Sequence, residues 1–307
     1  PPSPDNLGTV KFQLHTRIVL GESTKSLALS RDGALVAATG FDQKCRVFRT
    51  ATMTEAKALH LGTSFPNALC FSPDGASVAS GGKALTLFST STWKKGVSLK
   101  GHRHELQDAC FSPDGARVYT ASGNNYTPAD WTVRAWDAAT GAPGWKWKSS
   151  NVLYAVAVSP DGKTVAAGDS GGTVTLLDAD TGLPRATTRV GGWVYCLRFT
   201  PDGASVIASG DACELAVIAT ADATTRSVPM DHGARAFALT ADGATALVGA
   251  TRYGEPAPLV AVDLATGTVR ARGPAVGRLP QGVELSPDGA RLYVLVNDPN
   301  ELLVFDL

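Results

Sequence analysis

Five histidines are the residues of this sequence best suited to chemistry: His15, His60, His102, His104 and His232. His102 and His104 lie two positions apart, so both could face one side of an extended chain and bind a metal if a third ligand joined them. The five cysteines form no C-x-x-C pair that would supply such a ligand. The sequence also contains no P-loop, H-E-x-x-H or EF-hand pattern. It therefore predicts no metal, no cofactor and no catalytic residue.

A short turn of the form S/T-x-D-G recurs seven times and divides the chain into repeats. Its glycines lie 40–47 residues apart, at Gly33, Gly75, Gly115, Gly162, Gly203, Gly243 and Gly289. The segments around each turn are short and alternate between apolar and polar residues, which indicates β-strands. Four positions before the serine or threonine the residue is mostly small. Such strands could lie innermost, where seven of them crowd around one axis.

The best-defined repeat runs from Gly101 to Gly141. It starts with Gly101-His102, and its third expected strand ends with Trp136-Asp137, the two dipeptides typical of a WD40 repeat. The chain therefore resembles the WD40 family of β-propellers, strongly in this repeat and more weakly in the other six. The resemblance implies an all-β fold, a seven-bladed β-propeller of four-stranded antiparallel blades, in which residues 1–307 form a single domain.

In WD40 repeats a His, a Ser or Thr, an Asp and a Trp tie the blade together through hydrogen bonds. By motif position, the resemblance implies that this structural tetrad consists of His102, Ser122, Asp130 and Trp136. The insertion Asn124–Ala129 interrupts the pattern just before Asp130. Because a buried histidine and aspartate must satisfy each other or their neighbours, we expect a structural network here and not a catalytic site.

The first and last segments of the chain are expected to lie in the same blade. The chain finishes at Phe305-Asp306-Leu307 with the third strand of repeat seven, and Val10–Leu20 has no repeat of its own. Placed beside Leu302–Phe305, residues 10–20 supply the missing fourth strand, close the ring and cover two open sheet edges. Residues 1–9 are then expected to be a linker remnant, which predicts the C-terminal module of a longer multidomain protein.

The start of each inner strand is expected to lie at the rim of the central channel, where the connections between blades collect. Five positions before the turn serine or threonine stand Lys25, Asn67, Gln107, Tyr154, Tyr195, Arg235 and Gln281. Seven positions before it stand Ser23, Phe65, Glu105, Val152, Trp193, Gly233 and Leu279. Tyr, Trp and Arg supply much of the binding energy at protein interfaces, so we predict a partner-binding rim centred on Tyr154, Trp193, Tyr195 and Arg235. The alternative is that these are ordinary loop residues whose rings pack against neighbouring blades.

The composition limits which classes of binding partner and which cellular compartment are expected. Charge is balanced, with 28 basic and 28 acidic residues, so the sum does not favour a nucleic acid. No stretch is long and apolar enough to cross a membrane. The odd number of cysteines favours buried free thiols, and hence a cytoplasmic location over a secreted or periplasmic one. We expect the isolated domain to be monomeric.

These features favour a non-catalytic propeller that binds a protein or peptide as a scaffold or sensor. The alternative is a propeller-type enzyme, a lactonase or a cofactor-dependent dehydrogenase, which would need convergent acids, histidines or a metal at the channel mouth. The rim offers few such groups: Lys25, Glu105 and Arg235 as charges, with His104 and His232 nearby.

Overall fold

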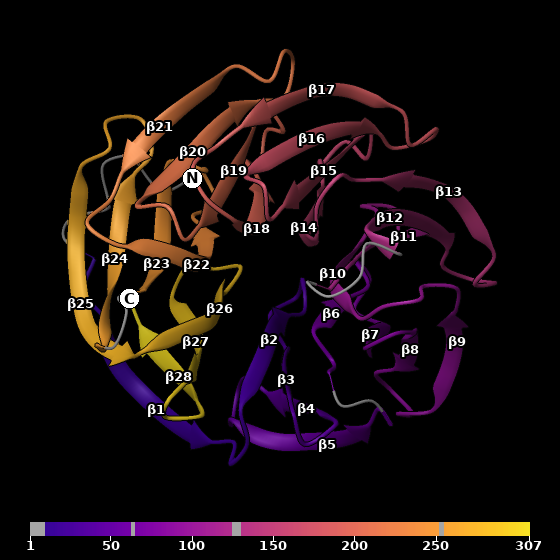
Figure 1. The fold of residues 1–307 in the computed structure, drawn as a ribbon. Helices are drawn as coiled ribbons and strands as arrows, with labels where there is room; N and C mark the ends of the chain where they lie inside the picture. The colour runs from indigo at the N-terminus through magenta and orange to yellow at the C-terminus, as the bar shows by residue number, and fades with distance from the viewer. Residues whose placement is uncertain (1–9, 63–64, 125–129, 252–254) are drawn as a thin grey trace.

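The computed structural model describes residues 10–62, 65–124, 130–251 and 255–307. Within these residues the chain forms seven four-stranded antiparallel sheets and no α-helix. The sheets stand around a central channel in chain order, like the blades of a propeller (Figure 1). The prediction of an all-β, seven-bladed propeller is confirmed.

Each blade is built from an inner, a second, a third and an outer strand. The inner strands are β2 (Thr24–Leu29), β6 (Ala68–Phe71), β10 (Leu106–Phe111), β14 (Leu153–Val158), β18 (Val194–Phe199), β22 (Gly233–Leu239) and β26 (Leu279–Leu285). The second strands are β3 (Leu35–Gly40), β7 (Ser77–Gly81), β11 (Arg117–Ser122), β15 (Thr164–Asp169), β19 (Ser205–Gly210), β23 (Thr245–Thr251) and β27 (Arg291–Asn297). The third strands are β4 (Lys44–Arg49), β8 (Leu85–Ser89), β12 (Thr132–Asp137), β16 (Thr173–Asp178), β20 (Glu214–Ala219), β24 (Ala257–Asp263) and β28 (Glu301–Asp306). The outer strands are β5 (Thr54–His60), β9 (Lys95–Leu99), β13 (Pro143–Lys148), β17 (Pro184–Arg189), β21 (Thr225–Pro229), β25 (Val269–Gly277) and, for blade seven, β1 (Gln13–Val19).

The repeated turn has the same hydrogen bonds in all seven blades. In blade two, the Ser72 hydroxyl donates to Asp74 at 2.6 Å and accepts the backbone N–H of Ser77 at 2.9 Å, while Asp74 accepts the N–H of Ala76 at 3.0 Å. Gly75 has φ of 69°, the left-handed region that glycine adopts without strain. The hydrogen bond from the serine or threonine hydroxyl holds the pKa of each turn aspartate below its usual range, and the bond from the backbone N–H is the second largest cause. The turn thus fixes the join between inner and second strands from local chemistry alone.

The hydrophobic core is divided among the gaps between neighbouring blades. Seven clusters of buried side chains occur, and each combines residues of two adjacent blades. The cluster between blades two and three, for example, joins Leu85 and Leu99 to Leu106 and Trp136. Each blade therefore buries its two faces against its neighbours.

The first and last strands share one sheet. Its order is β1-β28-β27-β26, and Ile18 pairs with Leu302 while Leu14 pairs with Phe305. The predicted closure of the ring by the N-terminal strand is therefore confirmed, and Figure 1 shows β1 lying along β28 in blade seven. The expected linker remnant, residues 1–9, lies outside the described residues.

The antiparallel order of the strands assigns each loop to one of two faces. The S/T-x-D-G turns and the connections from third to outer strands lie on one face. The connections between blades and those from second to third strands lie on the other, which we call the rim face.

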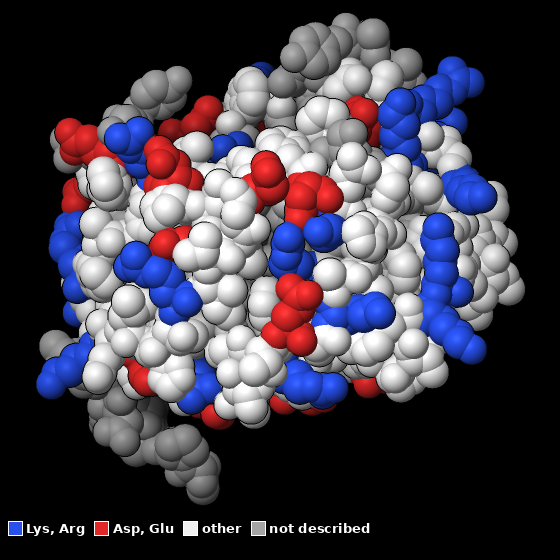
Figure 2. Space-filling view, turned by 90° about the horizontal axis from the view of Figure 1, so that it is seen from below, with Lys and Arg blue, Asp and Glu red and all other residues white. Residues whose placement is uncertain are grey.

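Figure 2 views the edge of the propeller, where basic and acidic side chains are interspersed. The described residues include no helix with the length and apolarity needed to span a membrane.

Candidate functional site

Blade three contains a buried chain of hydrogen bonds. His102 Nδ1 lies 3.0 Å from Asp130 Oδ2, and its Nε2 lies 2.8 Å from the hydroxyl of Thr120. Trp136 Nε1 donates to the same hydroxyl at 2.8 Å. Burial lowers the pKa of His102 in spite of the neighbouring carboxylate. A neutral imidazole that donates from Nδ1 and accepts at Nε2 satisfies every member, because Thr120 then accepts from Trp136 and donates to His102.

Asp130 receives more donors than this one histidine. The backbone N–H of Arg103 donates to Oδ2, and Thr132 and Arg134 donate to Oδ1 at 2.7 and 3.1 Å. Burial opposes ionisation of Asp130, but the bonds from His102, Thr132 and Arg103 outweigh it and hold the pKa of the carboxyl well below its usual range. The network is closed and fully bonded, so it ties strands together and presents no reactive group.

The hydroxyl of the tetrad belongs to Thr120, which corrects the prediction of Ser122. The Ser122 hydroxyl instead donates to the backbone carbonyls of His104 and Glu105, at 3.3 and 3.2 Å. Both residues lie on the same face of β11, so residue type and alternation do not distinguish them. The register does: Ser122 pairs with Leu106 at the end of the strand, one pleat nearer the rim face than Thr120. Of the insertion Asn124–Ala129, residues 125–129 lie outside the described residues.

Replacing His102 by alanine tests the structural role of this network. We expect His102→Ala to lower the free energy of unfolding by roughly 1–3 kcal/mol, since Asp130 and Thr120 lose a buried partner. Chemical denaturation of the variant beside His60→Ala, which removes an exposed histidine from β5, would measure the difference. Equal stability of the two variants would contradict the structural role.

The structure brings the four central rim residues together as one cluster, which we call the rim cluster: Tyr154, Trp193, Tyr195 and Arg235. The rings of Tyr154 and Trp193 are stacked with centroids 5.4 Å apart and planes at 16°. Tyr195 lies 5.5 Å from Tyr154 and 6.0 Å from Trp193, and the Arg235 guanidinium lies 4.4 Å from the Tyr195 ring centre. Trp193 is 37% exposed, and the other three side chains are partly buried. The cluster is therefore accessible, unlike rings sealed between blades.

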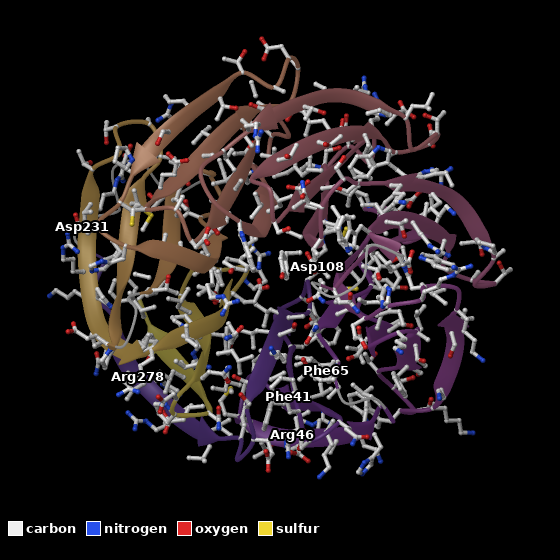
Figure 3. The ribbon with its side chains drawn as sticks, in the orientation of Figure 1. Phe41, Arg46, Phe65, Asp108, Asp231 and Arg278 are labelled. Carbon is white, nitrogen blue, oxygen red and sulfur yellow. The ribbon has the colours of Figure 1, made fainter. Side chains whose placement is uncertain are left out.

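The remaining rim predictions fall into two groups. Phe65 is 48% exposed and packs edge-on against Phe41 at 5.5 Å, and Lys25 lies over the Phe41 ring at 4.6 Å. Figure 3 shows Phe41 and Phe65 side by side. Asn67 donates to Gln107 at 3.2 Å, and Gln107 donates to the carbonyl of Gly123.

The other rim positions differ in how accessible they are. Gln281 and Glu105 are partly buried, and Leu279 is exposed. Val152 and Gly233, seven positions before their turns, are buried and take no part in the rim surface.

Sequence analysis missed Phe41 as a member of the rim. It lies in the connection between β3 and β4, on the same face as the connections between blades. The S/T-x-D-G register does not reach that loop, because the register describes inner strands alone. The topology of a four-stranded antiparallel blade is the signal that could have found Phe41.

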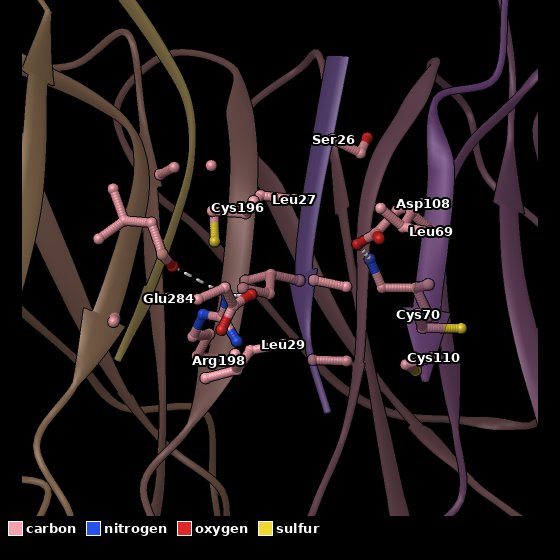
Figure 4. A pocket seen from close by; sticks show the side chains of 18 of the residues that line it. Ser26, Leu27, Leu29, Leu69, Cys70, Asp108, Cys110, Cys196, Arg198 and Glu284 are labelled. Atoms are coloured by element: carbon pink, nitrogen blue, oxygen red, sulfur yellow. Dashed lines mark hydrogen bonds and ion pairs between the residues drawn. The ribbon is translucent and has the colours of Figure 1, made fainter. Parts of the chain in front are cut away.

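A central channel of about 750 Å³ runs below the rim and is lined by all seven inner strands. On one wall, Arg198 pairs with Glu284 at 2.5 Å and donates to the carbonyl of Phe237 at 2.8 Å. On the opposite wall, Asp108 accepts the N–H of Val156 at 3.0 Å (Figure 4). Burial raises the pKa of Asp108 to about 6. These bonds connect different blades, so the charged groups help to hold the inner strands in place.

The cysteines and histidines do not gather into a metal-binding group in the described part of the chain. All five cysteines are free, and burial raises the pKa of Cys70, Cys110 and Cys196, which line the channel, so that their thiols stay protonated. Within the part of the chain that the structure describes, no group of three or more His, Cys, Asp or Glu residues could hold a metal ion. His104 Nδ1 lies 2.9 Å from the side-chain nitrogen of Asn124.

Comparison with known families agrees with this architecture. Residues 93–137 and 144–178 match the family described as WD40, WD domain, G-beta repeat. Each matched segment holds the outer strand of one blade followed by the first three strands of the next. A search of curated proteins found no match to this chain. The protein is thus a seven-bladed β-propeller, two segments of which match the WD40 repeat. Propellers of the WD40 family commonly serve as scaffolds for protein interactions and are typically not enzymatic.

Proposed function

We propose that this protein is a non-catalytic interaction module that binds a protein or peptide on its rim face. The observation that carries the proposal is the rim cluster, three aromatic rings and a guanidinium gathered beside the mouth of the channel. WD40 propellers generally bind proteins or peptides, which supports the same conclusion.

The rim cluster suits binding because its side chains are already held in place. The stacked Tyr154 and Trp193 rings and the Arg235–Tyr195 contact restrict each other. These side chains would therefore lose little conformational entropy when a partner binds. Tyr, Trp and Arg are also the residues whose truncation costs most at protein interfaces. The second aromatic pair, Phe41 and Phe65, gives a partner that crosses the channel mouth a further apolar contact.

The alternative, a lactonase or a cofactor-dependent dehydrogenase, would have to use the charged groups of the channel. Asp108 accepts backbone N–H groups from Val156 and Ala109, and Arg198 is bound to Glu284. These contacts favour a structural role over catalysis.

Because Cys213 alone of the five free cysteines is exposed, we also propose a reducing, cytoplasmic location.

Removing Trp193 and Tyr195, two of the three rings of the rim cluster, tests the proposal. Peptides selected from a random displayed library on the parent protein should bind the double variant Trp193→Ala/Tyr195→Ala at least roughly 30-fold more weakly, as expected when two interface hot spots are lost. The matched control is Leu183→Ala/Val269→Ala, which removes two apolar side chains that are 65% and 43% exposed on the opposite face. Equal weakening by both double variants would refute rim binding, and unfolding of the first would show that its rings belong to the core.

A further inference from the structure

The seven residues five positions before the repeated turns form a ring at the channel mouth, one from each blade, which we call the mouth ring. They are Lys25, Asn67, Gln107, Tyr154, Tyr195, Arg235 and Gln281, and all of them line the channel cavity. The mouth ring contains two cations and five neutral side chains with groups capable of hydrogen bonding, but no carboxylate. The charge of the mouth ring is therefore positive, although the chain as a whole has 28 acidic and 28 basic residues.

The two cations of the mouth ring are positioned by aromatic rings. Lys25 lies over Phe41 at 4.6 Å and Arg235 over Tyr195 at 4.4 Å. Among the described residues neither cation takes part in an ion pair, whereas Arg46, Arg134 and Arg198 each pair with a carboxylate. A cation–π contact holds a cation without neutralising it, so both charges stay available to a ligand.

Lys25 and Arg235 line the same cavity, and their charges interact. They belong to blades one and six, and Gln281 of blade seven stands between them in the ring. Burial, and after it the charge of Arg235, lowers the pKa of Lys25. Two like charges in a partly dehydrated opening repel each other more strongly than in water, and an anion between them would remove that repulsion.

Hydrogen-bond donors complete this side of the ring. The Gln281 amide has no hydrogen bond to the described residues, and the Tyr195 hydroxyl keeps its proton because burial, chiefly, raises its pKa. An amide N–H₂ and a phenol O–H are suitable donors to an oxyanion. Lys25, Gln281, Arg235 and Tyr195 thus come from four consecutive blades, one, seven, six and five.

We propose that this side of the mouth ring binds an anionic group, a carboxylate or a phosphate, carried by the peptide that docks on the rim; the peptide rests on the function proposed above. The acids in the region do not occupy the site. Asp211 accepts the backbone N–H of Trp193 at 2.5 Å, and Glu105 belongs to blade three, across the ring. Asp108, deeper in the channel, would repel an anion and keep it at the mouth.

The experiment uses the intact protein and defined probes. Three end-blocked pentapeptides, identical except for a central glutamate, phosphoserine or glutamine, are titrated calorimetrically, and inorganic phosphate is titrated at constant ionic strength. We expect the glutamate or the phosphoserine peptide to bind roughly tenfold more tightly than the glutamine peptide, and the tighter of the two identifies the carboxylate or the phosphate as the preferred group. The double variant Lys25→Met/Arg235→Gln should abolish the difference and the binding of phosphate.

The matched control removes the same net charge from the opposite face. Arg31→Gln/Lys163→Met replaces two exposed cations of the repeated turns and should bind like the parent. Equal losses in both double variants, equal binding of all three peptides, or no binding of phosphate to the parent would overturn the anion site. If library peptides still required Trp193 and Tyr195 in that case, the proposed rim function would stand without it. If phosphate bound but no library peptide required those rings, the anion site would stand alone.

Discussion

Replacing Trp136 by alanine is expected to lower the free energy of unfolding by about 3–5 kcal/mol, the usual cost of truncating a large buried aromatic side chain. Trp136 is 1% exposed and packs between blades two and three against Leu85, Leu99 and Leu106. Its removal leaves a cavity there and takes a donor from Thr120. Urea denaturation followed by circular dichroism measures the loss.

Trp136→Phe is the matched variant, because it keeps an aromatic ring in the gap while removing the indole N–H together with part of the fused ring. We expect it to lose about 1 kcal/mol, the net contribution of a typical hydrogen bond, plus a small packing term. If Trp136→Ala were as stable as Trp136→Phe, the gap between blades two and three would not depend on this side chain. Equal, large losses in both would instead assign the stability to the hydrogen bond and not to packing.

The number and order of blades could be predicted from sequence because the information is local. The S/T-x-D-G turn makes its own hydrogen bonds within a few residues, as between Ser72, Asp74 and Ser77, so it marks each blade whatever surrounds it. Ring closure could be predicted because one strand was left without a repeat, and an open sheet edge is unfavourable.

The tetrad hydroxyl could not be assigned because alternation has a period of two. Thr120 and Ser122 satisfy the pattern equally, and only the pairing of β10 with β11 decides between them. The rim residues could be located for a related reason: the inner strands converge, so their first residues must converge too. Which ring stacks on which is a different matter, since the contact of Tyr154 with Trp193 depends on side-chain rotamers. Phe41 lies on a loop outside the repeat register.

Deleting residues 1–20 is expected to open the ring. The deletion removes β1, which pairs with β28 from Gln13 to Val19, and leaves a row of unpaired backbone groups along β28. It also removes Ile18 and Leu20 from the cluster between blades seven and one. Apolar side chains of this size contribute about 1.5–3 kcal/mol each when fully buried, so the melting temperature should fall by roughly 5–15 °C, and the chain should aggregate through the open edge.

A deletion of residues 1–9 is the control, since it leaves β1 intact and should melt with the parent. Light scattering and thermal denaturation of the two truncated chains distinguish loss of the strand from loss of chain length. A synthetic peptide of residues 10–20, added to the larger truncation, should bind the β28 edge and restore much of the melting temperature, because the partly buried Thr16 and Ile18 alternate with exposed residues and so favour one register with β28. A larger truncation that stays monomeric and melts with the parent would show that β1 is not needed to close the ring.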